Sequence, residues 1–134
     1  MKLEIFTLCE YAAEYNGRVC VTGTIDRMQF PKVPVVVPRL TVYARVRFEQ
    51  IEAGVHTTKI AFIDEDGKSV MPPLSGSATV IFSGQDKTQV ANMIVHAANI
   101  PFQKFGEYRL DFAVGGALLG SIPVFVFPPG RPAV

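Results

Sequence analysis

The sequence contains few of the groups that catalysis and metal binding use. Its 134 residues include only two histidines, His56 and His96, and two cysteines, Cys9 and Cys20. No Cys-X-X-Cys or His-X-His spacing occurs, so a zinc site is not expected. Neither histidine lies in a glycine-rich elbow, and the glycine pair at 115–116 precedes a strand pattern rather than a helix. We therefore predict no catalytic, metal or cofactor site, and we expect a non-enzymatic protein.

Charge and long apolar runs are also scarce. Charged residues make up 19% of the chain and the net charge is +1, with no basic or acidic run that would favour nucleic acid or anionic lipid. No apolar stretch approaches the ~18 residues of a membrane helix. Glu4 and Glu10 interrupt the N-terminal region, where a signal peptide needs a continuous apolar core. We expect a cytoplasmic protein that binds neither nucleic acid nor membrane, with its cysteines in a reducing compartment.

What is present is an alternation of apolar and polar residues with period two, punctuated by turn residues every eight to twelve positions. This pattern is typical of β-sandwiches and barrels. We predict an all-β fold, an antiparallel immunoglobulin-like β-sandwich of about seven or eight strands, as one domain over residues 1–128 with a Pro/Gly-rich tail at 129–134. The predicted strands span residues 2–11, 18–26, 39–49, 56–64, 76–83, 88–99, 106–114 and 118–127.

The segment 88–99 fits two structures. Its apolar residues can form a helical face, or a strand face with Asn92 and His96 on the opposite side. We favour a strand, because every neighbouring element is a strand and Ile100-Pro101 ends it.

Two features favour a sandwich over a barrel. The prolines of residues 30–38 remove ladder donors, which indicates an extended edge or a crossing between sheets. In GEYRLDF, Tyr108 lies near the start of a late strand, as in the tyrosine corner of Greek-key sandwiches.

Several segments together resemble a family of small uncharacterised bacterial β-sandwich proteins. They are LCEYA at 8–12, NGRVCVTGTID at 16–26, the prolines ahead of VYARVRFE, and IPFQKFGEYRLDF followed by a Gly-Gly turn. The resemblance covers most of the chain. It implies a bacterial source, a sandwich fold and a cytoplasmic location. The family has no assigned activity, cofactor or catalytic residues, so the resemblance supplies none for this chain.

Two motifs have both a chemical and a structural interpretation. Asp64 and Asp66 have the spacing of a calcium loop, but Ser75 stands where the bidentate carboxylate belongs, so a polar hairpin tip is favoured. Cys9 and Cys20 lie opposite each other if residues 2–26 form a hairpin with a wide loop. They separate if Asn16-Gly17 is a two-residue turn. The sequence leaves both registers open, the first compatible with a disulfide and the second with two free thiols.

Two surfaces are candidate interfaces. Tyr43, Arg45 and Arg47 share the polar face of the strand at 39–49, and Lys59 on a neighbouring strand is a candidate to join them. Aromatic and arginine side chains are enriched at interfaces, although a solvated face with Arg47 paired to a carboxylate is the plainer interpretation.

The last strand is apolar on both faces, with Pro123, Phe125 and Phe127 on one of them. Pro123 suggests an edge position, which must be covered by the proline-rich segment, a second copy or a partner.

We therefore expect a binding or assembly module that acts through sheet-edge or sheet-face contacts, either with itself or with a protein partner. The alternative is a small-ligand-binding protein or enzyme with a site at a sheet or subunit boundary, using His96 or Asp64.

Overall fold

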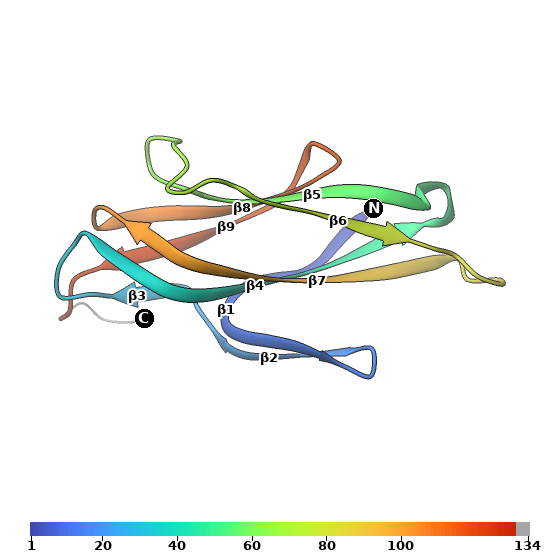
Figure 1. Cartoon of the computed structure of the whole chain (residues 1–134), viewed down its shortest axis with the longest axis horizontal. Coiled ribbons are helices and arrows are strands. Elements are labelled where there is room, and N and C mark those ends of the chain that lie inside the picture. Colours follow the sequence, from blue (N-terminus) through green and yellow to red (C-terminus); the bar gives the residue numbers. More distant parts are fainter. Residues whose placement is uncertain (131–134) are drawn as a thin grey trace.

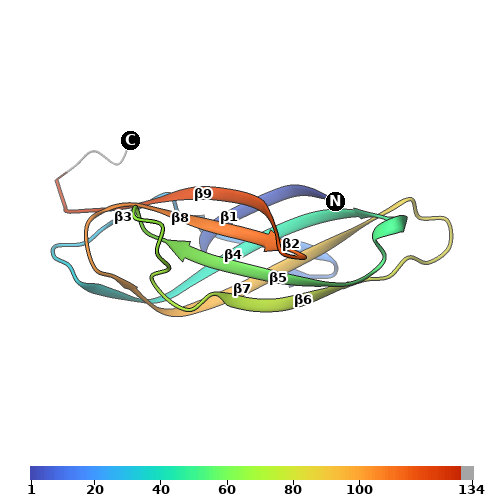
Figure 2. The ribbon, with the colours of Figure 1, turned by 90° about the horizontal axis from the view of Figure 1, so that it is seen from above.

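The computed structural model describes residues 1–130, which form two β-sheets packed face to face (Figure 1). The first sheet has the strand order β2-β1-β4-β7, and the second has the order β3-β9-β8-β5-β6. Neighbouring strands are antiparallel except β3 and β9, which are parallel. Seen from above, the strands of the two sheets cross at an angle (Figure 2). The strands are β1 (Lys2–Tyr15), β2 (Arg18–Thr24), β3 (Arg27–Gln29), β4 (Val35–Glu49), β5 (Gly54–Ile63), β6 (Leu74–Val80), β7 (Thr88–Phe102), β8 (Gly106–Val114) and β9 (Ala117–Phe127), with a short 3-10 helix, η1 (Gln50–Glu52).

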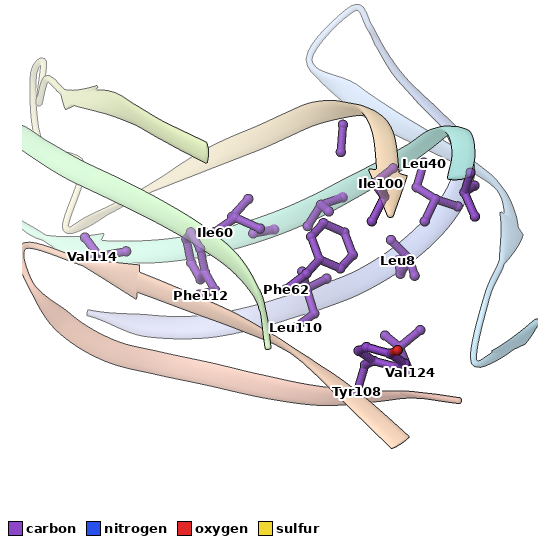
Figure 3. Close-up of a cluster of buried hydrophobic side chains, with 14 of the residues drawn as sticks. Leu8, Leu40, Ile60, Phe62, Ile100, Tyr108, Leu110, Phe112, Val114 and Val124 are labelled. Carbon is purple, nitrogen blue, oxygen red and sulfur yellow. The ribbon is translucent and has the colours of Figure 1, made fainter. Parts of the chain in front are cut away.

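The core lies between the sheets and follows the predicted alternation. Every second residue of β4 from Leu40 to Phe48 is buried, and so is every second residue of β8 from Tyr108 to Val114. Figure 3 shows Phe62, Leu110 and Phe112 pointing into the space between the sheets. Among the described residues, no helix is long and apolar enough to cross a membrane.

The sandwich prediction is confirmed as two packed sheets, with one strand more than predicted. Each predicted strand is present, including residues 88–99, which form part of β7 and continue through Pro101 to Phe102. The extra strand, β3, has three residues, too few to show a period of two. Most of the predicted tail at 129–134 lies outside the described residues.

The proline-rich segment contains both predicted structures, a crossing between the sheets and an extended edge. Residues 30–34 carry the chain from β3 in the second sheet to β4 in the first. Val35–Pro38 open β4 itself and form the extended edge that the prolines predict. Pairing of β4 with β1 extends only to Thr41, so this stretch has β7 alone as a neighbour. A strand with one neighbour tolerates a proline because half of its donors have no ladder partner.

The hairpin of β1 and β2 decides between the two cysteine registers. Asn16 and Gly17 have φ values of 52° and 77°, the positive values that a two-residue turn requires. The register then places Cys9 opposite Thr24 rather than opposite Cys20. Both thiols are free, Cys9 buried and Cys20 exposed.

This difference predicts selective thiol chemistry. Burial raises the pKa of Cys9, and its Sγ donates to the carbonyl of Thr41 at 3.4 Å. An aromatic disulfide reagent should therefore label Cys20 promptly and Cys9 only after unfolding, because the thiolate is the reactive form. Cys20→Ser should remove the fast phase. Rapid labelling of both thiols in the native protein would contradict this geometry.

Tyr108 makes the backbone contact that its position predicts. Its hydroxyl donates to the carbonyl of Lys104 at 2.6 Å, and its ring packs edge-on against Phe102 with centroids 4.9 Å apart. This hydrogen bond fastens the connection between β7 and β8, where the chain passes from the first sheet to the second.

Candidate functional site

The outer face of the first sheet is partly covered by the chain itself. β1 pairs with β4 as far as Cys9, and its remaining residues pair with β2. This hairpin lies on the side of β4 that faces away from β8 and β9, at the bottom of Figure 1. Tyr11 stacks on His96 of β7 with ring centroids 6.0 Å apart. Thr41 and Tyr43 point outward from the sandwich core, yet they are only 0% and 3% exposed.

Tyr43, the first predicted interface residue, is therefore buried beneath the β1–β2 hairpin and is not an exposed surface residue. Its hydroxyl donates to Oδ1 of Asn92 on β7 at 2.8 Å, and burial raises its pKa. Lys59 does not join this face. It lies on β5 in the other sheet, where its neighbours are β6 and β8, so that part of the prediction was wrong.

Arg45 and Arg47 lie on the outer face of β4 and share one carboxylate. Glu4 accepts from Nε of Arg45 at 2.9 Å and from Nε of Arg47 at 2.7 Å. Arg47 also donates through Nη1 to Thr88 at 2.9 Å. Two guanidinium groups on one carboxylate leave this cluster with a net positive charge.

This cluster predicts a loss of stability in acid. The hydrogen bond from Arg47, with a further one from Arg45, lowers the pKa of Glu4 below its ordinary value of 4.5. A lowered carboxyl pKa adds stability above the unfolded value, and that stability is lost as the pH falls through the folded value. The urea concentration at the midpoint of unfolding should therefore decrease as the pH is lowered below 4.5. In Glu4→Gln the same midpoint should decrease less over this pH interval. An identical acid slope in both proteins would exclude Glu4 as a contributor.

A groove separates the hairpin from the sheet beneath it. Its volume is about 510 Å³, within the range of ligand sites, which runs from about 300 to 1,000 Å³. Val19, Val21 and Arg18 line it from the hairpin, and Ile5, Tyr43 and Arg45 line it from the sheet.

β7 forms one edge of the first sheet, and β2 forms the other. β7 has 15 residues and pairs with β4 from end to end. In the part of the chain that the structure describes, no strand pairs with its other side. Its sequence, TQVANMIVHAANIPF, contains no Asp, Glu, Lys or Arg.

Both faces of β7 carry apolar side chains that are incompletely buried. Val90 and Ile94 lie on the outer face, and Met93 and Val95 point toward the core, where they pack against its margin. All four are half-buried. The sequence shows that this strand lacks charge, but the topology is needed to show that it forms an edge.

One protein-family model matches residues 4–127, nearly the whole chain. The chain belongs to DUF6941, a family of unknown function. No match was found among curated proteins or among solved structures. Membership in DUF6941 agrees with the resemblance to an uncharacterised family and supplies no activity, so the candidate site rests on geometry alone.

The last strand of this DUF6941 member is covered differently from β7. β3 pairs in parallel with Phe125–Phe127, so that end of β9 is not a bare edge. Phe127 is buried, and the Arg27 guanidinium lies 5.2 Å from the centroid of the half-buried Phe125 ring. Pro123 lies before the pairing with β3 begins. The cover at the end of β9 is β3, which precedes the predicted proline-rich segment; of that segment, Phe30 donates its backbone N–H to the carbonyl of Phe127 at 3.1 Å.

Asp64 and His96, the candidate residues for a ligand-binding or enzymatic site, both make contacts with other parts of the chain. Oδ1 of Asp64 accepts from the backbone N–H groups of Asp66 and Lys68, each at 2.9 Å, and these bonds lower its pKa. Nδ1 of His96 lies 2.9 Å from Oγ1 of Thr41. The structure thus gives Asp64 the role of a loop-stabilising side chain. His96 is exposed on the outer face of β7, where its ring stacks on Tyr11 of the hairpin.

Proposed function

We propose that this chain is a non-enzymatic assembly module, and that two copies associate through the edges of their β7 strands. The single observation that carries the proposal is a 15-residue edge strand with no charged residue. An unpaired edge offers a row of N–H and C=O groups to another strand.

The other edges differ from β7. Proteins protect sheet edges with short strands, charges, prolines or covering segments. β3 has three residues, β6 has seven and follows Pro72-Pro73, and β2 begins with Arg18. Along β7 the one proline, Pro101, comes second from the end. β7 therefore lacks these protective devices over most of its length.

A second copy suits this edge for geometric and electrostatic reasons. Two identical strands related by a twofold axis pair antiparallel, and the absence of charge removes like-charge repulsion in every register. Pairing would continue the first sheet across the axis and would bury more of Val90, Ile94, Met93 and Val95, which are half-buried in one copy. Burial of apolar surface contributes roughly 25 cal/mol per Å².

Sedimentation velocity of the full chain tests this proposal. Over roughly 1 to 100 μM, a range that brackets micromolar dissociation constants, the species should shift from 14.7 kDa toward twice that mass. A single species of monomer mass across the whole range would overturn the proposal.

The same proposal includes a cytoplasmic location, a bacterial source and an immunoglobulin-like relationship. The two free thiols support a reducing compartment. The hydrogen bond from Tyr108 to Lys104 supports a relationship to Greek-key sandwiches. The bacterial source rests on the resemblance of the sequence segments described above.

A further inference from the structure

We propose that the groove between the β1–β2 hairpin and the first sheet binds an amphipathic organic anion, of the class of medium-chain carboxylates. The groove includes the outer-face side chain of Asn92 on β7 but not the unpaired backbone edge of that strand, so this inference does not depend on self-association.

The groove has apolar walls on both sides. Val19 and Val21 of β2 are half-buried, packed against the buried side chains of Cys9, Ala12 and Tyr43. Ile5 of β1, which also lines the groove, is 41% exposed. An aliphatic chain placed between them would cover apolar surface that the fold leaves open. The hydrophobic effect would therefore contribute to the affinity of the groove for an aliphatic ligand.

The charged residues that line the groove are both cationic. Arg18 and Arg45 line it, and no carboxylate does. Glu4 accepts from Nε of Arg45 and also pairs with Arg47, and the Nη groups of Arg45 make no side-chain hydrogen bond within residues 1–130. Arg18 likewise has no ion pair in that range. Guanidinium groups bind carboxylates through paired N–H donors, so the charge of the site selects an anion.

The floor of the groove is already ordered. Tyr43 is 3% exposed, and its hydroxyl is held by Asn92, which also lines the groove. A floor that is fixed before binding reduces the ordering cost of a ligand. The apolar walls, the two arginines and the fixed floor together match a ligand with an aliphatic body and one anionic end.

An NMR titration with three eight-carbon probes tests the inference. Sodium octanoate, octanol and octylamine share a chain and differ in charge. Octanoate should shift the amide signals of Gly17, Val19, Val21 and Asn92 and saturate. Octylamine should leave these signals in place. Octanol should bind more weakly than octanoate.

Matched arginine variants identify the anion contact. Arg45→Gln should weaken octanoate binding about tenfold, the loss expected for a charge-assisted hydrogen bond. Arg109→Gln serves as the control, because Arg109 lies on β8 and pairs with Asp111 in the other sheet; it should bind octanoate like the wild type. Equal binding of octylamine, unchanged binding by Arg45→Gln, or shifts spread through the core would overturn the inference.

A monomeric variant separates this result from the proposed function. Val90→Lys alters the β7 edge without removing a groove residue. Because its added cation lies two positions from Asn92 on the same face, this variant should bind octanoate at least as tightly as the wild type. Octanoate binding that is lost in this variant would contradict an independent site.

Discussion

Val90→Lys is expected to make the chain monomeric at concentrations where the wild type is a dimer. Val90 is half-buried on the outer face of the β7 edge, opposite Arg47 on β4. A lysine at an edge strand is a device by which natural sheets prevent pairing with another strand, and in a paired edge its charge and bulk would lie beside the second copy. We expect the dissociation constant to rise at least about 100-fold, the equivalent of about 2.7 kcal/mol.

Val55→Lys is the matched control for that experiment. Val55 lies on β5 in the other sheet and is 70% exposed, so the same substitution there should leave self-association unchanged. Both variants should keep the far-ultraviolet circular dichroism of the wild type. A dimer that survives Val90→Lys, or that is lost equally in Val55→Lys, would show that β7 is not the interface.

Leu110→Ala is expected to cause the largest loss of stability. Leu110 is fully buried on β8, between β5 and β9 at the centre of the second sheet. Truncation of a buried leucine removes apolar contacts and leaves a cavity, which costs about 2–5 kcal/mol. Because domains are stable by about 5–15 kcal/mol, urea unfolding should show a much lower midpoint.

Leu118→Ala provides the matched comparison. Leu118 lies at the start of β9 and is 63% exposed, so the same truncation should change the free energy of unfolding by less than about 0.5 kcal/mol. Similar losses in the two variants would contradict the assignment of the core.

The sequence predicts the core well because the pattern that reveals a strand also reveals its buried face. The alternation in residues 106–114 identifies Tyr108, Leu110, Phe112 and Val114 as inward, and all four are buried. Asn16-Gly17 similarly indicates a turn, since few residue pairs accept two positive φ values.

The surfaces were harder to predict because they depend on which strands become neighbours. Tyr43 has the pattern of an exposed residue, and it is buried because the β1–β2 hairpin folds across distant residues of β7. The last strand and β7 are both apolar on two faces, and only the strand order shows that β3 pairs with the end of β9 while β7 pairs with β4 alone. Alternation along one strand carries no information about such long-range pairing.

Amide hydrogen exchange along β7, measured by NMR at a low and a high protein concentration, tests the edge-pairing proposal most directly. In one copy, alternate backbone groups of an edge strand point to solvent and exchange readily. If two copies pair through β7, these amides in Thr88–Phe102 should gain protection at high concentration and lose it in Val90→Lys. Protection that is independent of concentration in β7, or that appears at β6 or β9 instead, would contradict the proposal.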